Sequence, residues 1–234
     1  SDGGLISAGS LKRFENLATL DLSANQLDDI NAIAGLKKLR YLNMTGNKDL
    51  TSASLKKMQE ALPDCLLITQ SSGKTDEKTF RDGIANNELD KIQHLDLSDS
   101  GLISASSLKS LANLKTLDLG KNKLADLKGL SALDKLEHLD LTGNVPGLSL
   151  SEIGQLRKSL PNCFISLQSV NNPGEKSIKE LLEKNQLAKV QHLDLSDGGL
   201  ISAGSLKRFE NLATLDLSAN QLDDINAIAG LKKL

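Results

Sequence analysis

All three histidines of this chain stand two residues before an aspartate, in the recurring pattern H-L-D-L. A histidine beside a carboxylate can act as a general base or hold a metal ion. Residues two apart on an extended strand point to the same face, so each histidine would share a face with its aspartate. Whether the pairs share one site depends on the spacing of the strands that carry them. The pairs are His94 with Asp96, His138 with Asp140, and His192 with Asp194.

The histidine pairs belong to a leucine pattern, L-x-x-L-x-L, that occurs nine times along the chain. Its second apolar residue stands at positions 20, 42, 65, 95, 117, 139, 163, 193 and 215, in steps of 22 to 30 residues. With a trailing x-x-N/C-x-L, the pattern resembles the signature of the leucine-rich repeat family. Most copies resemble its short, 22-residue class. The two copies that read L-P-D-C and L-P-N-C, each followed by a 30-residue step, resemble its longer, helix-bearing class.

The resemblance implies an α/β solenoid, with a parallel β-sheet on the concave face and short helices and turns on the convex face. Each L-x-L segment would be one strand. We expect the two 30-residue steps to form helices on the convex side, whereas the shorter copies have room only for turns or short 3₁₀ segments. The first helix would cover 76–89, after Thr75 as its N-cap, with Phe80 and Ile84 on its apolar face. The second would cover 175–187, with Ile178, Leu181 and Leu182 on its apolar face.

An asparagine follows most of the strands and would point inward, where it can bond the main chain of the neighbouring coil. Such a ladder satisfies main-chain groups that are costly to bury without a partner. The ladder would consist of Asn25, Asn47, Asn122, Asn144 and Asn220, with interruptions at Gln70, Ser100, Gln168 and Gly198.

The coil spacing argues against a shared chemical site. His94 and His138 are two coils apart, which is about 10 Å at ~4.8 Å per coil, whereas a zinc–nitrogen bond is roughly 2 Å long. The chain also lacks the strained serine or cysteine turn of a nucleophilic triad. We therefore expect no enzyme activity, no catalytic residues, no metal and no cofactor. Cys65 and Cys163, four coils or roughly 20 Å apart, exceed the ~7 Å limit for a disulfide and are expected to be free and buried.

The aspartates form a row along the concave face, and two interpretations of it stay open. Aspartate is common in L-D-L-S repeats and can be satisfied by nearby hydroxyls; alternatively, the row forms an acidic groove for a basic partner or Ca²⁺. Apolar residues interrupt the row, and these could anchor a partner or pack under a neighbouring loop. The candidate partner-binding residues are Tyr41, Leu66, Ile68, His94, Asp96, Asp118, His138, Asp140, Phe164, His192 and Asp194.

Composition limits the classes of partner. A net charge of −2 gives no sign of attraction to nucleic acid. No apolar run approaches the ~18 residues that suggest a membrane-spanning helix. The expected partner is therefore a protein, and one candidate is the chain itself, through head-to-tail or lateral assembly.

Repetition also occurs at a larger scale. Residues 1–97 and 98–195 align as two four-coil blocks, and 196–234 are identical to 1–39. We interpret the three segments as one continuous solenoid with a 195-residue period, cut from a longer array. The residues after Leu234 would then read RYLNMTGNKDL, as they do after Leu39, and those before Ser1 would resemble LAKVQHLDL.

The sequence favours a non-catalytic structural or scaffolding protein, a segment of a longer tandem array or fibre. The alternative is a discrete recognition module that binds a protein on its concave face. A fibre would be extracellular or on the cell surface, and a recognition module could equally be cytoplasmic, so the sequence leaves the compartment undecided.

Overall fold

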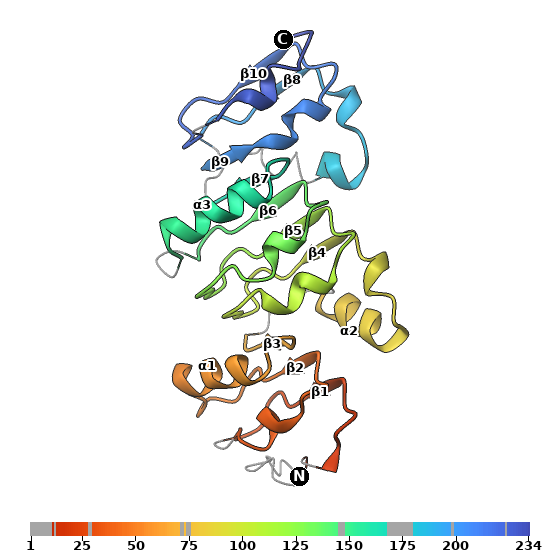
Figure 1. Ribbon diagram of the computed structural model, residues 1–234, viewed down its shortest axis with the longest axis vertical. Coiled ribbons are helices and arrows are strands. Elements are labelled where there is room, and N and C mark those ends of the chain that lie inside the picture. Colours follow the sequence, from red (N-terminus) through yellow and green to blue (C-terminus); the bar gives the residue numbers. More distant parts are fainter. Residues whose placement is uncertain are drawn as a thin grey trace.

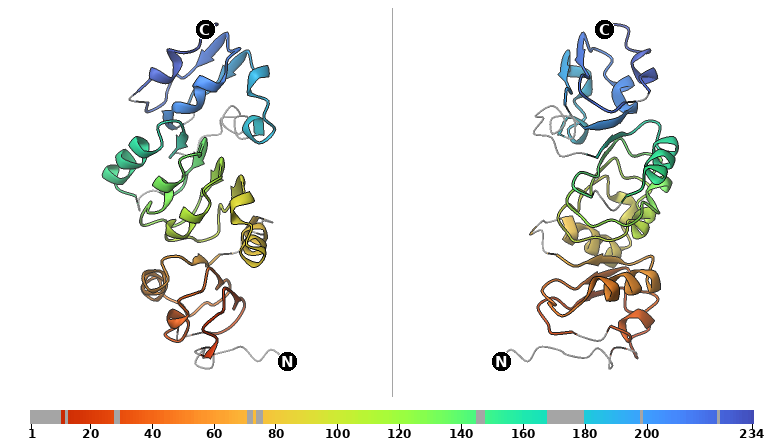
Figure 2. Two further views of the ribbon diagram at one scale, coloured as in Figure 1. Left: turned by 45° about the vertical axis from the view of Figure 1, so that its right-hand side comes forward. Right: turned by 90° about the vertical axis from the view of Figure 1, so that its left-hand side faces the viewer.

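The computed structural model describes residues 11, 13–27, 30–70, 73, 76–144, 148–167, 180–197, 199–222 and 224–234. The described residues form an elongated stack of coils, with residues 13–27 and 224–234 at opposite ends (Figures 1 and 2). Several predicted features lie outside the described residues: the cap at Thr75, the apolar Ile178, and the ladder interruptions at Gln168 and Gly198.

A strand forms at each of the nine leucine patterns. The central residue of each strand points into the coil, and Leu42 and Leu117, for example, are fully buried. The nine are β1 (Thr19–Asp21), β2 (Tyr41–Asn43), β3 (Leu66–Ile68), β4 (His94–Asp96), β5 (Thr116–Asp118), β6 (His138–Asp140), β7 (Phe164–Ser166), β8 (His192–Asp194) and β10 (Thr214–Asp216).

The strands form three sheets, where the repeat pattern predicts a single one. The first unit has β1-β2-β3, the middle unit has β4-β5-β6-β7, and the last unit has β8 paired with β10, all parallel. An additional strand, β9 (Leu200–Ala203), runs antiparallel to β7 and attaches the last unit to the middle one. Between β3 and β4, the main-chain N–H groups of Thr69 and Gln70 donate instead to the carbonyl of Ser100. Parallel strand pairing is therefore interrupted at both unit boundaries, and at the second one the antiparallel β7–β9 pair replaces it.

Two α-helices lie on the convex side, in copies where the sequence predicts only turns or 3₁₀ segments. They are α1 (Ser52–Ala61) and α3 (Leu150–Ser159). The hydroxyl of Thr51 accepts a hydrogen bond from Ser54 N–H and caps α1, and Ser149 forms a capping box with Glu152 at the start of α3. These copies are slightly longer than 22 residues, and that length with the caps is enough for a helix. The prediction was wrong here.

The copies without an α-helix contain the predicted 3₁₀ turns, which are η2 (Ile33–Gly35), η4 (Ser106–Ser110), η5 (Leu130–Ala132), η7 (Gly204–Arg208) and η8 (Asn226–Ile228). The two 30-residue steps also contain 3₁₀ turns, η3 (Leu89–Lys91) and η6 (Leu187–Lys189), which the sequence did not predict there.

The helix predicted at 76–89 exists as α2 (Asp76–Asn86), but its predicted place on the convex side is wrong. Figure 1 shows α1 and α3 on one side of the sheets and α2 on the opposite side. Phe80 of α2 belongs to the same buried cluster as Tyr41, Leu66 and Ile68, which project from the strand face opposite the coil interior. Because these side chains would otherwise be exposed on the concave face, burying them favours folding α2 over that face.

The predicted asparagine ladder is present within each unit. Asn122 is buried; its carbonyl oxygen accepts hydrogen bonds from the main chain of Ser100 and Leu102, and its amide donates to the carbonyls of Leu97 and Leu119. Asn47, Asn144 and Asn220 donate in the same way to the preceding coil. Asn25 bonds within its own coil, to Leu22 and Ser23.

The ladder is interrupted at both predicted positions that the structure describes. Gln70 is exposed and donates to Asp99, and the hydroxyl of Ser100 donates to Glu77 of α2. Both positions lie at the boundary between the first and middle units. The ladder therefore stabilises coils inside a unit and is absent from that boundary.

Candidate interaction surfaces

The apolar candidates are buried under the chain's own helices. Tyr41, Leu66 and Ile68 are at most 2 % exposed beneath α2, and burial together with the nearby Glu77 carboxylate raises the pKa of Tyr41 to about 12. Phe164 is fully buried in a cluster with Leu182, one of the described helical residues 180–183. In this structure these four side chains pack under a neighbouring segment of the same chain. Of the two interpretations of the sequence, this is local packing and not exposure as anchors for a partner.

The strand pairing also corrects the alignment of the concave row. Leu42 pairs with Leu67, and Leu139 pairs with Ile165, two residues beyond the positions that the leucine pattern suggests. The aspartate row therefore continues through Ile68 and Ser166. Leu66 aligns with Tyr41 and Phe164 aligns with His138, the position two residues before the row. A shift of two residues keeps every side chain on its predicted face.

The aspartates of the row close the turns after their strands. Asp118 accepts a hydrogen bond at 2.9 Å from Gly120 N–H, and Asp140 accepts one at 2.7 Å from Thr142 N–H. Asp96 and Asp194 accept equivalent bonds from Ser98 and Ser196, a side-chain turn that aspartate forms readily. Among the described residues, no three His, Cys, Asp or Glu side chains are grouped closely enough to hold a metal ion. These contacts support a structural role for the row.

Two of the three histidines contact a threonine of the next coil. His94 Nδ1 lies 3.0 Å from the Thr116 hydroxyl, and His192 Nδ1 lies 2.9 Å from the Thr214 hydroxyl. His138 is buried. Of the polar candidates, only His192 and Asp194 are fully exposed, while His94, Asp96, Asp118 and Asp140 are partly buried. The remaining accessible strip on the concave face is therefore short and polar.

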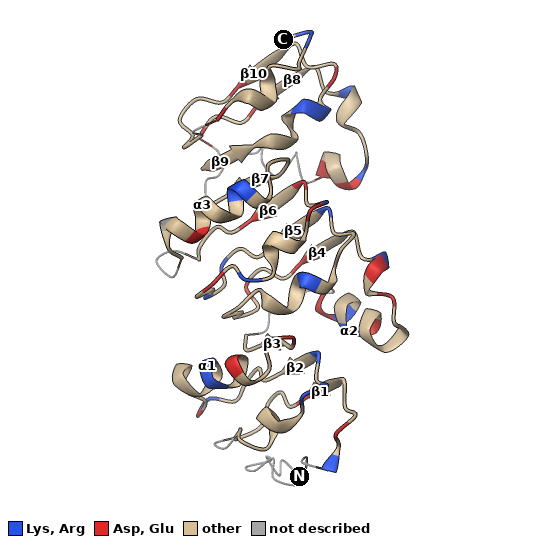
Figure 3. Ribbon diagram, in the orientation of Figure 1, with Lys and Arg blue, Asp and Glu red and all other residues tan. Residues whose placement is uncertain are grey.

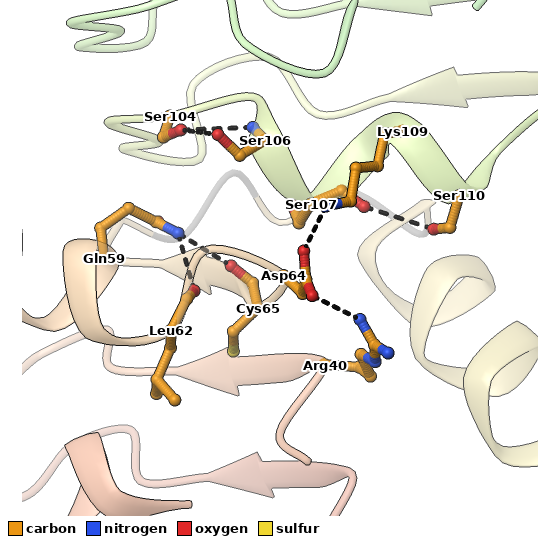
Figure 4. Close-up of polar contacts among 10 residues, drawn as sticks. All are labelled: Arg40, Gln59, Leu62, Asp64, Cys65, Ser104, Ser106, Ser107, Lys109 and Ser110. Carbon is orange, nitrogen blue, oxygen red and sulfur yellow. Dashed lines mark hydrogen bonds and ion pairs between the residues drawn. The ribbon is translucent and has the colours of Figure 1, made fainter. Parts of the chain in front are cut away.

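The boundary between the first and middle units, here called the first junction, contains a three-charge cluster (Figure 4). Asp64, just before β3, lies 3.4 Å from Arg40 of the preceding coil and 2.7 Å from Lys109 of the middle unit. The hydrogen bond from Lys109 holds the pKa of the Asp64 carboxyl below its usual value, and Arg40 adds to the effect. Asp64 thus links two units that share no strand pairing.

At the first junction, a side chain of α2 covers the free edge of the middle unit's sheet. The main-chain N–H of Asp96 lies on the edge of β4 opposite β5, and it donates at 2.7 Å to the carboxylate of Asp76 at the start of α2. This side chain takes the place of a neighbouring strand.

The boundary between the middle and last units, the second junction, uses the same positions with different residues. Glu137 forms an ion pair with Arg208, and Asn162 accepts a hydrogen bond from Lys207. The hydroxyl of Ser205 donates to the carbonyl of Glu137 at 2.7 Å, and to that of Asn162. A cleft of about 800 Å³ opens beside these residues, between α3 and the last unit.

Both cysteines are free and buried, as predicted. Burial raises the pKa of the Cys65 thiol to about 12, with a small opposing effect from Arg40, and it raises the pKa of Cys163 as well. A thiol that stays protonated is a poor nucleophile.

The candidates predicted from the sequence include none of the junction residues. The repeated segments contain a signal for them, because aligned positions differ in charge: Arg40 with Glu137, Asp64 with Asn162, and Ser110 with Arg208, which repeats Arg13 of the first block. Charges that change together in this way indicate residues that interact.

Comparison with known proteins places the fold in a family. The family described as "Leucine rich repeat" matches residues 5–48, and the one described as "Leucine Rich repeats (2 copies)" matches 84–132 and 112–158, together just over half of the chain. Among curated protein sequences, none matches the chain.

Three of the similar solved structures are bacterial proteins. An internalin, inlF, from Listeria monocytogenes is 20 % identical over 99 % of this chain and 70 % of its own length, with a TM-score of 0.36. Internalin C2 from the same species is 19 % identical over 100 % of this chain and 75 % of its own, with a TM-score of 0.31. A leucine-rich repeat protein from Leptospira interrogans is 24 % identical, with a TM-score of 0.32, and this chain spans 52 % of its length. With the repeated strands, the asparagine ladder and the matched family patterns, the chain belongs to the leucine-rich repeat family.

Proposed function

We propose that the chain is a non-catalytic structural or scaffolding segment of a longer tandem array or fibre, in which repeat units dock end to end. Leucine-rich repeat proteins generally mediate protein–protein interaction. The proposal is that the principal partner of each unit is the next unit of the same kind.

The observation that carries this proposal is the recurrence of the junction. Two successive boundaries in one chain use equivalent positions: the residue before a central strand, the residue before the cysteine, and the end of the following 3₁₀ turn. A unit that makes such contacts at both of its ends can be extended along one axis, and contacts that do not close into a ring produce filaments.

The burial of the concave anchors supports the same proposal. A recognition module relies on exposed aromatic or apolar anchors. Here Tyr41 and Phe164 are covered by α2 and by the segment of Leu182. Acidic and basic residues occur in all three units along the stack (Figure 3).

The test is to read the coding sequence on both sides of the segment and to measure the size of the intact product in solution. The expected result is at least one further 195-residue period and an elongated particle in sedimentation. A product that ends at Leu234 and sediments as a single monomer species would overturn the array proposal.

The second candidate function is recognition of a protein by the concave face of the last unit. His192, Asp194, Thr214 and Asp216 are exposed on neighbouring strands there. If this strip binds a partner, His192→Ala with Asp194→Ala should abolish co-purification of that partner, while Lys232→Ala on the same unit should not. Equal retention by both variants would exclude the strip.

A further inference from the structure

We propose that the charges at the two junctions form an ordering code, in which the end of a 1–97 block accepts the start of a 98–195 block and the end of a 98–195 block accepts the start of a 1–97 block. The partner that each end selects is a repeat block of the other kind. This inference rests on the proposed end-to-end docking, and it adds which end fits which start.

The positions compared are structurally equivalent. Arg40 and Glu137 directly precede β2 and β6, and the carbonyl of each accepts a hydrogen bond from the next strand, from Leu66 N–H and Phe164 N–H respectively. Ser110 ends the 3₁₀ turn η4, as Arg208 ends η7.

The remaining positions match as well. Asp64 and Asn162 each precede a buried cysteine. Lys109 and Lys207 are the fourth residues of η4 and η7, and each contacts the residue before that cysteine. The junctions are therefore two versions of one interface.

Each junction has two cations and one anion, in different places. In the first, the anion is Asp64, with Arg40 and Lys109 on either side of it. In the second, the anion is Glu137, which pairs with Arg208, and Asn162 is a neutral acceptor for Lys207. The Glu137 and Arg208 side chains are only 18 % and 36 % exposed, so solvent screens this pair less than a fully exposed one.

Mismatched junctions would lose this balance. The start of the last unit repeats the start of the first block, since 196–234 are identical to 1–39. If the start of a 1–97 block followed the end of another 1–97 block, the arginine found here as Arg208 would lie against Arg40. If the start of a 98–195 block followed the end of another 98–195 block, Ser110 would face Glu137, and Glu137 would have no arginine to pair with. Like charges in contact are unfavourable, and an unpaired carboxylate loses the interaction that offsets its desolvation.

The experiment converts each junction into the other within the 234-residue chain and measures the thermal midpoint at low and high salt. Ser110→Arg should place an arginine against Arg40 and lower the midpoint by about 2–4 °C. Adding Arg40→Glu together with Asp64→Asn should restore most of that loss, because the three residues then reproduce Glu137, Asn162 and Arg208. The control adds Lys232→Gln to Ser110→Arg. It gives the same net charge as the matched set through a change in the last unit, and it should restore nothing.

The reciprocal set uses the second junction. Glu137→Arg should lower the midpoint, and adding Arg208→Ser with Asn162→Asp should restore it by rebuilding the first junction's residues. High salt should reduce the losses in both sets, since electrostatic repulsion is screened whereas steric strain is not.

The code is supported if only the matched substitutions restore the midpoint and if the restoration is weaker at high salt. Additive effects, or equal restoration by Lys232→Gln, would overturn it. The thermal midpoints test the ordering code inside one chain, whereas the coding sequence and sedimentation test the array. Either proposal can therefore fail while the other holds.

Discussion

The two junctions begin with nearly the same sequence, GLISASSLK at 101–109 and GLISAGSLK at 199–207, and yet they differ in structure. In the last unit, residues of this segment form β9 and pair antiparallel with β7. In the middle unit, the equivalent residues form no strand, and the carbonyls of Ser100 and Gly101 accept bonds from Thr69 and Gln70. One motif therefore has two uses, and its neighbours determine which one it adopts.

The single difference within this segment, Ser106 against Gly204, explains part of the contrast. A side chain on Gly204 would collide with the carbonyl of Pro161, so only glycine permits this approach of the last unit. Ser106 instead bonds Ser104 in its own turn. The second junction is thus built on close main-chain packing, and the first on a helix and a charged cluster.

Removing the cover over the first unit should have the largest effect. Phe80→Ala should lower the free energy of unfolding by about 3–5 kcal/mol, because a fully buried aromatic side chain is lost from the cluster under α2. It should also lower the pKa of Tyr41 from about 12 toward its ordinary value as the phenol becomes solvated. Tyr41 is the one tyrosine in the chain, so an ultraviolet titration reports on it alone.

Phe14→Ala is the matched control, since Phe14 is 47 % exposed. It should change neither the stability by more than about 1 kcal/mol nor the tyrosine titration. An unchanged Tyr41 titration in Phe80→Ala would show that α2 is not what buries the phenol.

The asparagine ladder joins coils inside a unit and is absent from the first junction, and two substitutions test this difference. Asn122→Ala should cost about 2–4 kcal/mol, because main-chain groups of several residues lose their partner in a buried site. Gln70→Ala, at the exposed interruption, should cost no more than about 0.5 kcal/mol. Denaturant unfolding of both variants measures the difference. Equal losses would contradict the conclusion that the ladder ends at the boundary.

Close packing at the second junction predicts a smaller loss of stability, and one that differs between the two junctions. Gly204→Ala should destabilise the chain by about 1–3 kcal/mol, because its methyl group forces the last unit away from Pro161. Ser106→Ala, the same position at the first junction, should cost less than Gly204→Ala. Hydrogen exchange of the β7 and β9 amides locates the loss, and protection unchanged in Gly204→Ala would refute the packing argument.

The charged cluster of the first junction predicts the smallest effect, of about 0.2–1 kcal/mol, since its side chains are partly exposed. The pKa of Asp64 is lowered in the folded state, so its contribution is present above the unfolded carboxyl pKa of about 3.9 and is lost as the pH falls through the lower folded value. Asp64→Asn should therefore lose less stability than the unaltered chain on acidification from pH ~5 to ~2. Parallel pH profiles for both proteins would show that Asp64 is not coupled to Lys109.

The repeat pattern predicted much of the fold because its signals are local. The strand positions, the inward leucines, the buried thiols of Cys65 and Cys163, and the amide bonds of Asn122 all follow from periodicity within one or two coils. Capping residues such as Ser149 and Glu152 were also visible in the sequence, although the copy length argued against a helix there.

The candidate site was predicted less well, because exposure is not a local property. Strand alternation predicts that Tyr41 and Phe164 face away from the coil interior, but no local pattern indicates that Phe80 and Leu182 would cover them. Asp118 and Asp140 were correctly assigned to a row, and the structure supplied the turn bonds that account for it.

The sequence by itself thus determined the repeating coil and the residues that had to be buried, since alternation and spacing specify which side chains face inward. Only the tertiary structure decided that α2 packs over the strands, that the sheet divides in three, and that β9 pairs with β7. Those outcomes depend on contacts between segments tens of residues apart. The free energy of such contacts depends on the apolar area buried between the segments, on the close approach of Gly204 to Pro161, and on the ion pairs of Asp64 and Glu137. It cannot be read from one segment, because each contact needs residues from two.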